Sequence, residues 1–131
     1  MALYPHDGNW RFACKNGMAF NNPLTAFCGK AQGKAEAGRL PDFKSFVNVE
    51  PANIMISTLK KAEDGHGTVI RFYEAEGRYA RATVTGFRPF TRAFLTDMLE
   101  YDIQELPVNA AGSVEISVKP YEIVTIRTYL E

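Results

Sequence analysis

The chain has 131 residues, which suits one domain, and 46% of them are hydrophobic, so it can build a core. Fifteen basic residues balance fifteen acidic ones, which argues against nucleic acid or an anionic membrane as the main partner. No apolar run approaches the ~20 residues of a membrane span, and a lone domain without net charge is prone to self-association.

Residues 1–42 are predicted to form an N-terminal extension. Residues 12–20 (FACKNGMAF) lack a two-residue alternation and favour one short helix. Asn22 precedes Pro23 and ends it, because the residue before a proline avoids the helical conformation. Residues 24–28 fit a strand, and the glycine-rich stretch 29–38 is typical of a loop.

Residues 45–78 predict a β-hairpin. Two runs rich in β-branched and aromatic residues, 54–59 and 69–73, flank a polar turn that contains Asp64-Gly65, a strong hairpin signal. Simple alternation places Ile54, Ile56 and Thr58 on one face of the first strand. Met55, Ser57 and Leu59 would then lie on the opposite face.

The rest of the chain alternates in the same way between turns. Further strands are predicted at residues 46–49, 79–85, 90–98, 101–106, 114–118 and 122–130. In the 90–98 strand, alternation groups Phe90 with Phe94 against Ala93 and Leu95. Short strands with turns every 8–12 residues are typical of an antiparallel β-sandwich, here of about seven strands over residues 43–131.

The hairpin also carries a resemblance to a known family. It is similar to the C-terminal β-sandwich region of the α-mannosidases of glycoside hydrolase family 38, which contains segments of the type S-F-V-x-V-E-P-x-N, L-K-K-A-E-D-G and R-x-Y-E-x-x-G-R. The matching residues are Ser45, Phe46, Val47, Val49, Glu50, Pro51, Asn53, residues 59–65, Arg71, Tyr73, Glu74, Gly77 and Arg78. Residues 2–11 and 119–127 resemble the family's flanking segments, so the resemblance spans nearly the whole chain in order.

The resemblance implies a fragment of a longer enzyme. Residues 1–42 would be the end of a preceding large β-domain with its linker, and residues 43–131 an accessory, non-catalytic domain that packs against the catalytic part and stabilises it. The parent would hydrolyse α-mannosides with retention in mannose metabolism, using zinc held by its N-terminal domain. We expect the chain alone to be inactive, without a cofactor of its own, and cytoplasmic.

The residues themselves support this expectation of inactivity. A glycosidase needs two carboxylates across the scissile bond, but each acidic residue here has an ordinary structural explanation; Glu74 and Glu76, for example, flank a glycine turn beside basic neighbours. Cys14 and Cys28 are expected to be free and buried rather than bridged. The sequence therefore predicts no catalytic, cofactor-binding or metal-binding residue.

One surface is a candidate for binding. Arginines interleaved with aromatic residues on strands and turns form either a solvated sheet face or a docking surface for the rest of the enzyme. Trp10 is either a hydrophobic anchor or a platform for a sugar ring. The alternative function is therefore an autonomous carbohydrate-binding module, and a small independent hydrolase is a third hypothesis. The candidate residues are Trp10, Arg71, Tyr73, Arg78, Tyr79 and Arg81.

Overall fold

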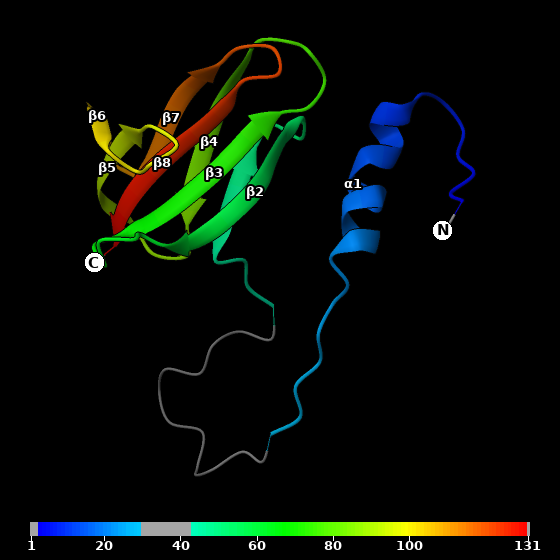
Figure 1. Ribbon diagram of the computed structural model, residues 1–131, viewed down its shortest axis with the longest axis horizontal. Helices are drawn as coiled ribbons and strands as arrows, with labels where there is room; N and C mark the ends of the chain where they lie inside the picture. Colours follow the sequence, from blue (N-terminus) through cyan, green and yellow to red (C-terminus); the bar gives the residue numbers. More distant parts are fainter. Residues whose placement is uncertain (1–2, 30–42, 131) are drawn as a thin grey trace. The chain divides into compact units, whose positions relative to one another are not determined.

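The computed structural model describes residues 3–29 and 43–130, and the chain divides into two compact units near residue 40 (Figure 1). Each unit is described by itself. No helix within the described ranges is long and apolar enough to cross a membrane. The predicted loop at 29–38 and the boundary at residue 42 lie largely outside these ranges.

The N-terminal unit contains one helix, α1 (Trp10–Asn21). The side chain of Asn9 caps its start by accepting a hydrogen bond of 3.0 Å from the Arg11 amide. Asn22 closes the last turn through bonds to the Met18 carbonyl, directly before Pro23. The predicted helix is therefore confirmed, and it begins two residues earlier than expected.

The strand predicted at residues 24–28 is wrong, because this segment has no regular secondary structure. A strand needs a neighbour to complete its ladder, and no strand lies in the described part of this unit. Cys14 and Cys28 are free, but neither is fully buried: Cys14 is half-buried and Cys28 exposed.

The C-terminal unit is the predicted antiparallel β-sandwich, with eight strands in its described residues (Figure 1). One sheet has three strands in the order β1-β4-β7, and the other has five in the order β2-β3-β8-β5-β6. The strands are β1 (Val47–Glu50), β2 (Ile54–Lys61), β3 (Thr68–Glu74), β4 (Ala80–Gly86), β5 (Phe90–Thr96), β6 (Asp102–Leu106), β7 (Ser113–Val118) and β8 (Ile123–Leu130).

The core lies between the two sheets and consists of their inward-facing side chains. The three-stranded sheet contributes Ala82, Val84, Val114 and Val118, and the five-stranded sheet contributes residues such as Phe72, Ile70 and Ile126. Each of these side chains is fully removed from water. The alternation predicted for the strands that became β4 and β7 is confirmed. In β8 the predicted inner face is also confirmed, since Val124 and Ile126 lie in the core, but the residues that alternate with them are buried as well.

Two β-bulges overturn the alternation predicted for β2 and β5. Ser57 is an extra residue in β2, so that Thr58 lies opposite Arg71 and Leu59 opposite the core residue Ile70. Leu59 therefore shares the inner face with Ile54 and Ile56, whereas Thr58 lies on the outer face. A bulge reverses the facing of every residue beyond it, because side chains alternate with a period of two.

The second bulge is Thr91 in β5. Phe90 pairs with Leu130 and Arg92 with Tyr129, which leaves Thr91 unpaired in the ladder. Phe90 consequently faces the core together with Ala93, and not with Phe94 as alternation predicted. Both bulged residues donate their hydroxyl to a carbonyl of the partner strand, Ser57 to Arg71 and Thr91 to Tyr129.

Candidate functional site

Of the six residues selected from the sequence, the five in the sandwich do not converge on one site. Arg71 and Tyr73 lie in β3 on the outer face of the five-stranded sheet, since both alternate with the core residue Phe72. Arg81 lies on the outer face of the other sheet, where it forms a 2.6 Å ion pair with Glu115. The sandwich therefore places Arg81 on the opposite side from Arg71 and Tyr73.

The other three candidates lie elsewhere. Arg78 and Tyr79 belong to the turn between β3 and β4, where Arg78 pairs with Glu76 at 2.8 Å and Tyr79 is 78% exposed. Trp10 belongs to α1 in the N-terminal unit, with the Arg11 guanidinium 5.7 Å from its ring centroid. No common ligand surface is formed by the candidates of the sandwich.

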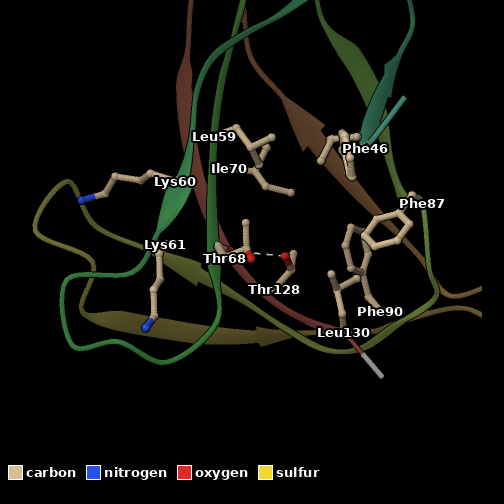
Figure 2. Close-up of a pocket in the computed structure, with 11 residues that line it drawn as sticks. Phe46, Leu59, Lys60, Lys61, Thr68, Ile70, Phe87, Phe90, Thr128 and Leu130 are labelled. Carbon is tan, nitrogen blue, oxygen red and sulfur yellow. Dashed lines mark hydrogen bonds between the residues drawn. The ribbon is translucent and has the colours of Figure 1, made fainter. Parts of the chain in front are cut away.

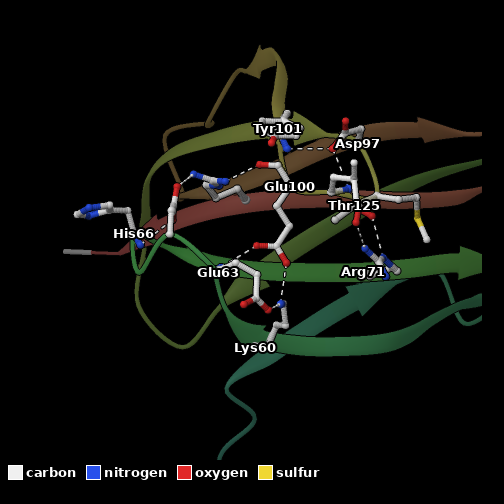
Figure 3. Close-up of polar contacts among 12 residues, drawn as sticks. Lys60, Glu63, His66, Arg71, Asp97, Glu100, Tyr101 and Thr125 are labelled. Atoms are coloured by element: carbon white, nitrogen blue, oxygen red, sulfur yellow. Dashed lines mark hydrogen bonds and ion pairs between the residues drawn. The ribbon is translucent and has the colours of Figure 1, made fainter.

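A polar cluster that the sequence did not indicate covers the outer face of the five-stranded sheet (Figure 3). Its centre is Glu100, in the 97–101 loop that joins β5 to β6, and Glu100 is only 6% exposed. Its carboxylate pairs with Lys60 of β2 at 2.7 Å and accepts a 2.8 Å hydrogen bond from the Glu63 amide. Since β2 and β5 are separated by β3 and β8, the loop crosses two strands to reach Lys60.

Two arginines of the five-stranded sheet hold the loop through its backbone carbonyls. Arg127 of β8 donates to the Glu100 carbonyl and forms a 2.6 Å ion pair with Asp64 of the hairpin turn. Arg71 of β3 donates to the Met98 carbonyl at 3.2 Å and to the Thr125 hydroxyl at 2.9 Å. The loop, the hairpin turn and the sheet are thus joined through charged groups, of which Glu100 and Arg127 are almost fully withdrawn from water.

These contacts shift the pKa values of the acids downward. The Lys60 ammonium, followed by the Glu63 amide, lowers the pKa of Glu100. The amide of His66, with Arg127, lowers the pKa of Asp64 against the opposing effect of burial. Glu100 raises the pKa of Lys60 in return. These shifts favour the charged forms of Lys60, Asp64 and Glu100.

A second buried carboxylate, Glu74, ties together one end of the sandwich. Its side chain is fully buried, and its two oxygens accept five hydrogen bonds. The donors are the Asn53 amide at 2.7 Å and the backbone N–H groups of Glu76 at 2.8 Å, Gly77 at 2.6 Å, Arg78 at 3.1 Å and Tyr121 at 3.1 Å. Burial raises the pKa of Glu74, but these bonds outweigh it and hold the pKa at about 2.

Glu74 has the structural role at the glycine turn that the sequence indicated, but the basic partners expected for it were wrong, since its partners are amide groups. A signal was present in Glu74-Ala-Glu-Gly-Arg78, where a carboxylate three residues before a turn glycine can accept the N–H groups of that turn. The contributions of Asn53 and Tyr121, 21 and 47 residues away, carry no local signal.

An apolar groove opens between the edges of the two sheets, with a volume of about 300 Å³ (Figure 2). Phe46 and Phe87 form one wall, with their ring centroids 5.3 Å apart in an edge-to-face arrangement. Leu59, Ile70 and Leu130 line the side formed by the five-stranded sheet. The groove suits an apolar side chain better than a polar ligand, because few polar groups converge on it.

The described residues hold no group of three or more His, Cys, Asp or Glu side chains that could bind a metal ion. What the sandwich contains instead is two buried carboxylates, Glu74 and Glu100, that hold backbone amides in place, together with an apolar groove and exposed apolar side chains.

Comparisons with known proteins agree with this architecture. Residues 53–126 match the family described as "Glycosyl hydrolases family 38 C-terminal beta sandwich domain". A protein of Halalkalibacterium halodurans named "Putative mannosylglycerate hydrolase" is 26% identical over 125 residues, which cover 95% of this chain and 13% of that protein. Alpha-mannosidase G of Dictyostelium discoideum is 29% identical over 134 residues, which cover 96% of this chain and 12% of that protein.

The chain therefore spans 12–13% of the length of these curated relatives. The family match covers more than half of the chain and lies within the sandwich. The resemblance stated from the sequence motifs is confirmed: the chain belongs to the family of C-terminal β-sandwich domains of family 38 glycosyl hydrolases.

Proposed function

We propose that this domain stabilises an α-mannosidase-like glycoside hydrolase by packing against its catalytic part. The observation that carries the proposal is the alignment of nearly the whole chain with about one eighth of two much longer proteins, both named as glycosidases. The other seven eighths of such an enzyme provide ample room for a separate catalytic domain. The parent enzyme would hydrolyse α-mannosides with retention, and its zinc ion would be held by the catalytic part.

The internal chemistry of the sandwich supports an accessory role. Its buried carboxylates are occupied by structural donors, five of them on Glu74. A second hypothesis, carbohydrate binding, rests on Trp10, whose ring is half exposed. Sugar sites commonly combine an aromatic face with several polar side chains, and the Trp10 ring is approached by the neighbouring Arg11.

Two measurements test the proposal. The chain alone, with and without added zinc, is assayed for turnover of 4-nitrophenyl α-mannoside, and we expect none. The parent enzyme is then produced with and without this segment, and the half-life of its activity is measured at elevated temperature. We expect a longer half-life with the segment, because a packed domain stabilises the native state to which it binds.

Each result decides between the hypotheses. Turnover by the purified chain would support the independent hydrolase, and an equal half-life with and without the segment would overturn the stabilising role. Titration with mannose, followed by the fluorescence of Trp10, tests the binding module. A saturable change at millimolar sugar or below would favour that module over the accessory domain.

A further inference from the structure

We propose that the tip of the 97–101 loop is the contact through which the sandwich docks onto the rest of the enzyme, an inference that rests on the proposed function. The tip consists of Met98, Leu99 and Tyr101, which are 60%, 75% and 70% exposed. These three large, mainly apolar side chains lie within four residues of one loop, and grouped exposed apolar side chains are typical of a surface that a partner covers.

The loop is held in a single shape by its own hydrogen bonds. The Asp97 carboxylate accepts from the amides of Leu99 and Tyr101, both at 2.9 Å. The Asp97 amide donates to the Tyr101 carbonyl, and the Glu100 amide donates to the Asp97 carbonyl. Glu100 adopts a left-handed conformation, with φ of 71°, which directs its carboxylate inward while its neighbours face solvent.

The sheet then anchors this shape through charged groups. Lys60, Arg71 and Arg127, from three different strands, bind the loop at Glu100 and Met98 (Figure 3). Because its backbone is already fixed, the loop loses little conformational freedom when its apolar tip binds a partner. Such preorganisation lowers the entropic cost of association. It is expected of a loop that binds a partner, and a loop that only connects two strands does not need it.

The charges around the tip indicate the chemistry of the partner surface. The carboxylates of the cluster and the loop outnumber the three cations, and the more exposed side chains of the cluster are acidic: Glu63, Asp64 and Asp102. Among the cations, Arg127 is the most withdrawn, with 9% of its side chain exposed. The complementary surface is therefore an apolar pocket rimmed by Lys or Arg side chains.

The occupant we infer is the catalytic part of the family 38 enzyme itself. The chain represents 12–13% of the length of its relatives, so most of such a polypeptide remains to cover this surface. A second copy of the chain is the competing occupant, and the experiment below distinguishes the two.

The test follows oxidation of Met98 by hydrogen peroxide, measured by mass spectrometry of its peptide. In the isolated chain Met98 should react readily, and Met55, which is 8% exposed, should react slowly. In the whole enzyme that contains this chain, we expect Met98 to react roughly tenfold more slowly than in the isolated chain, because oxidation follows exposure.

Two variants and a matched control locate the contact. Tyr101→Ser and Leu99→Ser in the whole enzyme should restore the reactivity of Met98 and shorten the half-life of activity by about fivefold, the size expected when an interface residue is truncated. Phe43→Ser removes another exposed aromatic side chain, 88% exposed, from the segment before β1, and it should change neither quantity. The variants alter exposed side chains, so circular dichroism of the isolated chains should show unchanged folding.

The outcomes separate the two proposals. If the segment prolongs the half-life while Met98 is equally reactive in both states, or if only Phe43→Ser shortens the half-life, the stabilising function stands and the loop contact is overturned. If Met98 becomes protected in the isolated chain as its concentration rises, the occupant is a second copy and the inference is also overturned. A half-life that does not depend on the segment removes both proposals.

Discussion

Replacement of Glu74 by glutamine should remove a large part of the stability of the sandwich. One carboxylate oxygen accepts from Asn53 and Glu76, and the other accepts from Gly77, Arg78 and Tyr121. Glutamine keeps one accepting oxygen and places an NH₂ group, itself a donor, where the other oxygen was. At least two donors then lose their acceptor in a site without access to water.

The structure gives two routes to the magnitude. Each buried donor left without an acceptor costs about 1–3 kcal/mol, so two cost roughly 2–6 kcal/mol. Independently, a pKa lowered from 4.5 to about 2 corresponds to roughly 3 kcal/mol in favour of the charged form. A loss near 3 kcal/mol would lower the melting temperature of a domain of this size by on the order of 10–20 °C.

The effect should depend on pH in a defined direction. The pKa of Glu74 is lower in the folded state, so its stabilisation is fully present above the unfolded pKa near 4.5 and is lost as the pH falls through about 2. The difference in unfolding free energy between wild type and Glu74→Gln should therefore be greatest at pH 6 and clearly smaller at pH 3.

The assay is urea unfolding followed by far-ultraviolet circular dichroism, which reports on the β-strands directly, whereas Trp10, the one tryptophan of the chain, lies in α1. The matched control is Glu115→Gln, which removes an exposed ion pair with Arg81 and should cost less than about 1 kcal/mol. A Glu74→Gln loss as small as that of the control, or one of equal size at pH 6 and pH 3, would refute the reasoning.

Three further predictions follow from the same geometry. Gly77→Ala should destabilise the domain more than Gly65→Ala by about 1–2 kcal/mol in urea unfolding. Both glycines have positive φ, but a Cβ at Gly77 would lie 2.5 Å from the Tyr121 hydroxyl, whereas one at Gly65 would lie 3.8 Å from the end of the flexible Lys61 side chain. Equal losses of stability in the two variants would contradict this prediction. Arg127→Met should release the 97–101 loop, so that the amides of Leu99 and Tyr101 exchange hydrogen about tenfold faster by mass spectrometry, whereas unchanged exchange would show that Arg127 does not hold the loop. Residues 43–131 produced alone should melt within about 5 °C of the full chain, because all five donors to Glu74 lie inside that range; aggregation or a larger drop would contradict the predicted boundary.

Strand positions could be predicted because they follow from local pattern. The alternation of Val114, Ile116 and Val118 reflects burial on one face of a pleated strand, and the structure confirms it. In β8 the predicted inner face is confirmed by Val124 and Ile126, which lie in the core, although Thr125 and Arg127 on the other face are buried as well. The facing of Leu59 and Phe90 could not be predicted in this way. A bulge forms where two strands must fit each other's curvature, and neither Ser57 nor Thr91 is a residue that marks such a position by itself.

The polar clusters were missed for a related reason. Asp97 and Glu100 have the composition of an ordinary connection, and only the order of the strands brings that connection over Lys60, 40 residues earlier in the chain. The same holds for the Tyr121 amide that binds Glu74. Long-range donors to a buried charge are set by tertiary structure, so a single sequence cannot identify them.

The direction of the pKa shifts connects these clusters to function. A general acid in a glycosidase needs a raised pKa, so that its carboxyl group still carries a proton near neutral pH. Glu74 and Glu100 are shifted the opposite way, each by donors that favour the carboxylate. Burial of an acidic side chain is thus used here to fasten turns and a loop to a sheet. That use agrees with the proposed role of the domain, which is to support a catalytic part.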